Sequence, residues 1–140
     1  MIKQISVFVE NKKGRLAALT KVLADAGIDL VSLSIADTTQ FGILRCIVSD
    51  VDKAVLVLKE AGFTINLTDV VGVCVPDAPG GLYSVLDVLT NKDISISYLY
   101  SFARRDKKDA VILIKVENAQ EAIDAFNEAG IELATQDDVK

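Results

Sequence analysis

The sequence predicts an α+β fold in which a βαββαβ unit occurs twice, each unit having an antiparallel four-stranded sheet with both helices on one face. Two observations predict this fold. The chain matches itself, because Leu16 aligns with Leu82 and, after a two-residue insertion in the second copy, "EAG" at 60–62 aligns with "EAG" at 128–130. The hydrophobic period also changes between two and 3.6 in the same order in both copies.

We expect the two ferredoxin-like units to cover residues 1–69 and 70–140. One such unit alone leaves the other sheet face and an edge strand without a cover. Pairing of the two units, or a dimer of chains, is the expected remedy.

The first copy opens with a strand and a helix. Residues 3–10 alternate between apolar and polar side chains, which predicts a half-buried strand. Residues 15–26 have helical spacing, and Gly27 is expected to end that helix. Its predicted inward face consists of Leu16, Leu19, Val22, Leu23 and Ala26.

Two β-rich runs follow, over residues 28–37 and 41–49, and the polar residues "TTQ" between them predict a turn. The run "DVDKAVLVLKEAG" predicts a second helix, with Asp50 as its N-cap and Gly62 as its C-terminal glycine. A short strand over 63–67 closes the unit.

The second copy repeats this order of elements. We expect its strands and helices over residues 70–76, 81–91, 94–103, 109–117, 119–129 and 131–135. The predicted inward residues of its helices are Leu82, Val85, Leu86 and Leu89 in the first and Ala122, Ile123 and Phe126 in the second.

Composition excludes several classes of function. The net charge is -5, and the basic cluster "RRDKK" at 104–108 is interrupted by Asp106, so we expect no nucleic-acid partner. The chain has no histidine, the commonest general base, and no spacing typical of a catalytic site, so we do not expect an enzyme. We expect a cytoplasmic protein with no membrane partner, because no apolar run suits a signal peptide or a membrane span.

The two cysteines, Cys46 and Cys74, each lie in an alternating apolar run. A buried thiol in such a run acts as a small hydrophobic side chain. We therefore expect core positions rather than a disulfide, a metal ligand or a nucleophile, and we expect no metal and no cofactor.

The strand-to-helix loops are the candidate ligand sites. One reads Asn11-Lys12-Lys13-Gly14-Arg15-Leu16 and its counterpart reads Asp77-Ala78-Pro79-Gly80-Gly81-Leu82. Free N–H groups and the helix dipole favour an anion there by about 0.3–1 kcal/mol, and glycine lets a ligand approach the backbone. An α-amino acid suits such a loop, because its carboxylate meets the N–H groups while an Asx oxygen accepts from its ammonium.

The structural alternative is that Asn11 and Asp77 are only helix caps or turn formers. A single loop of this kind favours that alternative. Two copies in register, each at the same place in a βαββαβ unit, favour a ligand site.

The pattern Asn/Asp-x-Pro-Gly-x-Leu after the first strand, followed by Ala-Gly-Ile-Asp/Asn at the second strand, resembles the ACT domain over essentially the whole chain, as a tandem pair. ACT domains are small regulatory modules of amino-acid metabolism that commonly bind an amino acid between two ACT units. The resemblance implies ligand contacts from the loop residues Asn11, Lys13, Gly14, Arg15, Leu16, Asp77, Ala78, Pro79, Gly80, Gly81 and Leu82.

The resemblance also implies that the residue opening the second strand, Asp29 or Ser95, faces the ligand from the neighbouring unit. Lys13 stands where the family usually has proline, whereas Pro79 fits the pattern. Asp29 and Ser95 are inequivalent, as are Asn11 and Asp77, which suggests that the two sites differ in affinity and leaves open whether one or both are used.

Three other features receive a structural interpretation. The aromatic row Tyr98, Tyr100 and Phe102 is expected to pack rather than to stack on bases. A β-bulge, which the alignment of Leu33 with Leu99 hints at, would reassign some of these faces. The cluster at 104–108 is expected to be a solvated hairpin turn, and the tail "TQDDVK" a solubilising end.

The predicted function is therefore regulatory. We expect a protein that senses a free amino acid where two ACT units meet and signals to a regulated enzyme or other partner, with a homodimer as the other expected assembly. The alternative is a non-catalytic protein-interaction subunit that binds no ligand and docks through a sheet face or edge strand.

Overall fold

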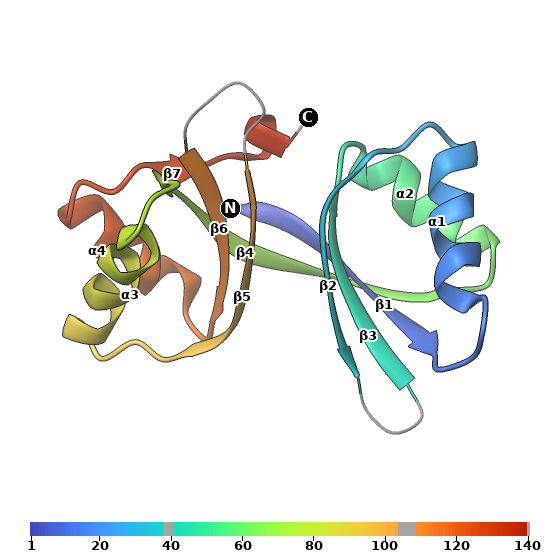
Figure 1. Cartoon of the computed structure of the whole chain (residues 1–140), viewed down its shortest axis with the longest axis horizontal. Coiled ribbons are helices and arrows are strands. Elements are labelled where there is room, and N and C mark those ends of the chain that lie inside the picture. The colour runs from blue at the N-terminus through green and yellow to red at the C-terminus, as the bar shows by residue number, and fades with distance from the viewer. Residues whose placement is uncertain (38–40, 104–108, 140) are drawn as a thin grey trace. The chain divides into compact units, whose positions relative to one another are not determined.

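The structure is a computed structural model that describes residues 1–37, 41–103 and 109–139 (Figure 1). The turns predicted at 38–40 and 104–108 lie outside the described residues.

The elements follow the predicted βαββαβ order twice, which confirms the α+β, ferredoxin-like fold. The first copy comprises β1 (Ile2–Glu10), α1 (Arg15–Asp25), β2 (Leu30–Asp37), β3 (Phe41–Val48), α2 (Val51–Glu60) and the first part of β4 (Thr64–Pro76). The second copy comprises the rest of β4, then α3 (Gly81–Asn91), β5 (Ile96–Ala103), β6 (Asp109–Val116), α4 (Ala119–Glu128) and β7 (Leu133–Ala134), followed by the 3-10 helix η1 (Gln136–Val139).

The described residues divide into two compact units. The N-terminal unit consists of Lys3–Thr68 with Val139, and the C-terminal unit consists of Asp69–Asp138 with Met1–Ile2. In each unit the helices lie on one face of the sheet (Figure 1). The ends of the chain are therefore exchanged, because each unit includes a short piece from the far end of the sequence.

The two sheets have the same topology. The strand order is β2-β3-β1-β4 in the N-terminal unit and β5-β6-β4-β7 in the C-terminal unit. The registers also match, since Ile5 lies opposite Cys46 in one sheet and Val71 lies opposite Ile114 in the other. The duplication read from the sequence is thus a duplication of strand pairing.

The second strand of each copy has an irregularity in its register at an equivalent place. The shift lies between Leu30 and Ser32 in β2, and between Ile96 and Tyr98 in β5. The shift has the register change that the bulge suggested by the alignment of Leu33 with Leu99 would produce. A shift of one residue changes the face on which the following side chains lie, so the alternation of the sequence alone assigns these strands incorrectly.

Each unit has its own hydrophobic core between its helices and its sheet. The N-terminal core includes Ile5, Val7, Leu19, Leu23, Cys46, Ala54, Leu58 and Phe63, and the C-terminal core includes Val71, Val73, Val85, Leu89, Ile114, Ala122 and Phe126. The prediction that Leu16 and Leu82 lie inward is wrong, because they are 40% and 41% exposed. Both lie in the first turn of their helix, beside the strand-to-helix loop.

The prediction of separate strands over 63–67 and 70–76 is also wrong. The chain runs through both as one strand, β4, from Thr64 to Pro76. The polar pair Thr68 and Asp69 looks like a break in the hydrophobic pattern, but it contains neither glycine nor proline and stays extended.

The tail differs from the solvated end that was expected. The predicted strand over 131–135 is shortened to β7, and η1 follows it. Asp138 accepts a hydrogen bond from the Thr135 N–H (2.7 Å), and Val139 is 1% exposed. The last residues therefore pack as part of the fold.

Both cysteines are buried, as predicted, and both are free thiols. Within the described part of the chain, no helix is long and apolar enough to cross a membrane.

Candidate functional site

The two strand-to-helix loops have the same backbone hydrogen bonds. The Lys12 N–H donates to the Glu10 carbonyl at 2.7 Å, and the Ala78 N–H donates to the Pro76 carbonyl at 2.9 Å. The first N–H of each helix also donates back into the loop. The Arg15 N–H donates to the Lys12 carbonyl at 3.2 Å, and the Gly81 N–H donates to the Ala78 carbonyl at 3.1 Å. The loops are therefore two copies of one backbone conformation, although only one of them contains proline.

Both loops end in a glycine that is the N-cap of the helix. Gly14 has φ 86° and Gly80 has φ 88°, in the left-handed region that favours glycine. The helix-cap half of the structural alternative for Asn11 and Asp77 is therefore wrong, and their role as turn formers stays a prediction. Because glycine has no side chain, the N-cap offers no side-chain acceptor to the first N–H groups of either helix.

The second helix of each unit begins differently. The Asp50 carboxylate accepts from the Lys53 N–H at 3.1 Å, and the Asn118 side chain accepts from the Glu121 N–H at 3.2 Å. The prediction of Asp50 as an N-cap is confirmed. Asx capping is thus present at α2 and α4. At α1 and α3 the first N–H donates back into the loop, while the next N–H groups of the first turn have no side-chain cap and can meet another acceptor, such as a carboxylate.

A pocket of about 160 Å³ lies beside the N-terminal loop. Of the predicted site residues, Asn11 and Leu16 line it. The other lining residues come from β1, the loop, β2 and β3, and they are Val9, Glu10, Lys12, Ile35, Gly42 and Leu44. The pocket therefore has an apolar floor with charged and amide groups at its rim.

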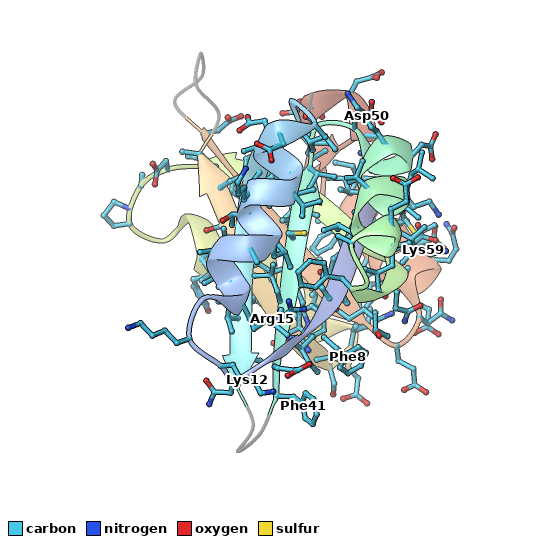
Figure 2. All side chains as sticks on the ribbon, turned by 90° about the vertical axis from the view of Figure 1, so that its right-hand side faces the viewer. Phe8, Lys12, Arg15, Phe41, Asp50 and Lys59 are labelled. Carbon is cyan, nitrogen blue, oxygen red and sulfur yellow. The ribbon has the colours of Figure 1, made fainter. Side chains whose placement is uncertain are left out.

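Glu10 and Lys12 form an ion pair in this rim, with Nζ and Oε2 3.0 Å apart. The hydrogen bond from Lys12 and its positive charge lower the pKa of Glu10 below its ordinary value of 4.5. The pair is exposed and adds little stability, but it places opposite charges side by side. Figure 2 shows Lys12 and Phe41 at one end of the N-terminal unit and Asp50 at the other.

Arg15, another predicted ligand residue, is not among the residues that line the pocket. Its guanidinium carbon lies 4.6 Å from the centroid of the Phe63 ring, in a cation–π arrangement. Within the described part of the chain its Nε is buried and has no hydrogen-bond partner. Two other predicted ligand residues of the loop, Lys13 and Gly14, are exposed and are not among the residues that line the pocket.

Asp29 lies far from the loop of its own unit. Its N–H donates to Ser49 Oγ at 2.9 Å, and the Ser49 N–H donates to the Asp29 carbonyl at 3.0 Å, next to the end of β3. The loop adjoins the start of β3 instead, where Glu10 pairs with Phe41. Asn11 and Asp29 are therefore at opposite ends of one sheet, and no ligand the size of an amino acid can touch both within one unit.

A family model described as an ACT domain pair matches residues 1–139. The chain belongs to the ACT domain family. The resemblance read from the loop motifs is thereby confirmed, and the two compact units correspond to a pair of ACT units. ACT domains are regulatory modules, so the family supports a regulatory protein.

Solved structures share this fold. Protein BT0572 from Bacteroides thetaiotaomicron is 43% identical, with 99% of this chain and 94% of that chain covered and a TM-score of 0.91. The ligand-free regulatory subunit of aspartate kinase from Thermus thermophilus is 16% identical, with 91% of each chain covered and a TM-score of 0.65. The aspartate kinase regulatory subunit from Thermus flavus is 16% identical, with 91% and 92% covered and a TM-score of 0.60. No curated protein matches the chain.

The loop of the C-terminal ACT unit is exposed from Asp77 to Gly80, while Gly81 is partly buried. A Cβ at Gly81 would collide with the carbonyl oxygen of Pro76. The second glycine therefore lets the start of α3 pack on the preceding strand, which is a structural role. Gly80 has the positive φ, and Leu82 is exposed like its counterpart in the N-terminal ACT unit.

Ser95 lies at the far end of the C-terminal ACT unit, in a cavity of about 650 Å³. The acidic residues Asp93, Glu117 and Glu121 share this cavity, and Asp93 has a positive φ of 56°. Sequence reasoning missed the cavity. The available signal was the Asn118 cap between two glutamates, which places carboxylates just after β6, whose last residue Val116 pairs with Ile96 at the start of β5.

Cys74 Sγ and the carboxylates of Asp109 and Glu132 lie within 4.8 Å of one another. Such a group can hold a metal ion, but each of these residues also has other interaction partners. Sequence reasoning could not find this cluster, because its members are on β4, on β6 and just before β7.

Proposed function

We propose that this ACT domain pair senses a free amino acid and passes the signal to a partner, either a regulated enzyme or a second copy of the chain. The observation that carries the proposal is the contrast between helices. In both units the first helix begins at a glycine that offers no side-chain acceptor, while the second helix has an Asx cap.

The ligand carboxylate would accept hydrogen bonds from the N–H groups that follow the first one in the opening turn of α1 or α3. Its ammonium would donate to the side-chain oxygen of Asn11 or Asp77. Asp29 or Ser95 would complete the site from a neighbouring unit, since the opposite ends of one sheet cannot both contact one amino acid. The bound ligand would then favour one arrangement of units, which is what allosteric coupling requires.

The described residues offer carboxylates, lysines and thiols but no histidine, and the proposal includes no catalytic role. We place the protein in the cytoplasm, where free amino acids and their enzymes meet. Two similar structures are regulatory subunits of aspartate kinase, and by analogy an enzyme of amino-acid metabolism is the favoured partner.

Thermal melts with each of the twenty amino acids at millimolar concentration test the proposal. A ligand present at 100 times its Kd stabilises the fold by about 2.7 kcal/mol, so at least one amino acid should raise the Tm. The variants Asp77→Ala, Gly80→Val and Asn11→Ala test which loop binds. The control variant Asp50→Ala removes a helix cap, so it should lower the Tm and leave the ligand-induced rise intact.

A rise that is lost in one or more of the loop variants and kept in the control supports the proposal. No rise with any amino acid overturns it in favour of a protein-interaction subunit. A rise that persists in all three loop variants moves the site away from the loops.

A further inference from the structure

We propose that the pocket of the N-terminal ACT unit takes an amino acid with an aliphatic side chain, with its ammonium facing Glu10 and the neighbouring Asn11 and its carboxylate facing Lys12. This inference rests on the proposed function and names the class of ligand. The loop motif alone suits the backbone groups of any amino acid, whereas the pocket beside it has a distinct chemistry.

The floor of the pocket is apolar. It is built by Val9 from β1, Leu16 from α1, and Ile35 and Leu44 from β2 and β3. Leu16 is 40% exposed and Ile35 is 47% exposed, so apolar surface remains open to water on the helix side of the sheet. Exposed apolar surface at the mouth of a pocket is typical of a binding site for an apolar group.

The size of the pocket limits the ligand. Its volume is about 160 Å³. Sites for drug-sized ligands have about 300–1,000 Å³, so this pocket suits one small side chain. A charged side chain would lose its hydration on the apolar floor without gaining a partner there. An aliphatic side chain is therefore preferred over an acidic or a basic one.

The rim matches the other end of such a ligand. Glu10 and Lys12 present a carboxylate and an ammonium 3.0 Å apart, and both side chains are exposed. A zwitterionic amino acid can replace the Glu10–Lys12 pair with two ion pairs, one between its ammonium and Glu10 and one between its carboxylate and Lys12. The later N–H groups in the first turn of α1 lie close to Lys12 in the chain, and the positive end of the helix dipole attracts the same carboxylate.

The equivalent positions of the C-terminal unit lack these features. Strand registers place Val9 opposite Gly42 in one sheet and Val75 opposite Ala110 in the other, so alanine replaces the pocket glycine. Ser101 stands in the place of the apolar Ile35.

The charged pair is missing there as well. Glu10 and Lys12 correspond to Pro76 and Ala78, which the matching loop hydrogen bonds show. The aliphatic class is therefore assigned to the N-terminal unit alone.

Gly42 provides a test that does not disturb the backbone. A Cβ at this position would have its nearest neighbour, Ile35 Cγ2, at 3.5 Å, which is ordinary van der Waals contact. Gly42 also has no positive φ, and valine suits a strand. Gly42→Val should therefore keep the fold and fill the pocket. Ala110→Val makes a matched change at the equivalent position of the C-terminal unit.

Isothermal titration calorimetry of the full chain with leucine, isoleucine, valine, alanine, aspartate and lysine measures the preference. Leucine has three more carbon atoms than alanine, and their partial burial corresponds to about tenfold tighter binding. Gly42→Val should weaken leucine binding by about tenfold or more, while Ala110→Val leaves it unchanged. Denaturant midpoints without ligand check that both variants fold.

Two leucine analogues test the rim. 4-Methylpentanoate lacks the ammonium and 3-methylbutylamine lacks the carboxylate, so each should bind about tenfold or more weakly than leucine. Equal affinity of either analogue and leucine would overturn the assigned orientation.

The two proposals fail separately. If no amino acid binds, the proposed function itself is wrong. If aspartate or lysine binds more tightly than leucine, or if folded Gly42→Val binds leucine as the unchanged chain does, the aliphatic pocket is wrong and amino-acid sensing stands.

Discussion

The guanidinium carbon of Arg15 lies 4.6 Å from the centroid of the Phe63 ring. Arg15 is the first residue of α1, and Phe63 comes just before β4, so the contact joins the start of the first helix to the start of the fourth strand. Phe63 is part of the N-terminal core. An arginine that the loop motif suggests as a ligand contact therefore has a structural partner.

Arg15 and Phe63 are expected to be energetically coupled. In a double-mutant cycle with Arg15→Ala and Phe63→Leu, the coupling free energy of unfolding should be about 0.5–2 kcal/mol, as for a partly desolvated cation–π pair. Urea denaturation of the four chains measures it. Arg15→Ala should change amino-acid affinity less than twofold, and a tenfold loss would show that Arg15 leaves Phe63 to contact the ligand.

The two glycines of the C-terminal loop should respond differently to substitution. Gly81→Ala places a Cβ against the Pro76 carbonyl, so it should lower the free energy of unfolding by about 1–3 kcal/mol through overpacking. Gly80→Ala meets no crowding but forces alanine to a positive φ, at about 1–2 kcal/mol. Gly80→Asn should recover part of that loss, because asparagine adopts the left-handed region more readily. Equal stability of Gly80→Asn and Gly80→Ala would contradict this explanation.

The titration of Glu10 should depend on Lys12. Lys12 lowers the pKa of Glu10 below 4.5, so the stabilising contribution of the pair is present above 4.5 and is lost as the pH falls through the lowered value. NMR of the Glu10 side-chain carboxyl carbon should give a midpoint below 4.5 in the unchanged chain, and Lys12→Gln should move it upward. An unchanged midpoint in the variant would mean that the ion pair does not persist in solution.

Cys46 should make stability decrease at alkaline pH. Burial raises the pKa of the Cys46 thiol from 9.0 to about 12. Because the folded-state value is the higher one, this contribution is complete below 9.0 and is lost as the pH rises toward about 12, with a slope of about 1.4 kcal/mol per pH unit.

Cys46→Ala tests this contribution, since it removes the titrating group. Denaturant unfolding at several pH values above 9.0 should show a shallower pH dependence for the variant than for the unchanged chain. Parallel curves would contradict the assignment to Cys46.

The duplicated fold could be predicted from the sequence because each copy has its own residues that mark where the helices begin and end. Asp50 and Asn118 cap equivalent helices, and Gly62 and Gly130 end them with positive φ values. Caps and C-terminal glycines depend on neighbours within a few residues, so sequence alone can reveal them. The continuous β4 could not be predicted this way. Two polar residues between apolar runs have the same local pattern whether they form a turn between two strands or lie within one strand.

Sequence predicted only those pocket residues that lie in the strand-to-helix loop and the helix that follows it. Asn11 and Leu16 belong to the loop and its helix, and both line the pocket. Ile35, Gly42 and Leu44 come from strands whose register depends on the bulge at the start of β2, so their positions require the pairing itself. Arg15 was assigned by its place in the motif, while its direction is set by the distant Phe63.

The continuity of β4 limits how one copy of the repeat can be deleted or exchanged. It runs without interruption from Thr64 to Pro76, and the division between the two compact units falls inside it, between Thr68 and Asp69. A deletion or exchange of one copy would therefore cut a hydrogen-bonded strand rather than a linker. Neither copy can therefore be excised at the boundary between the units without breaking β4.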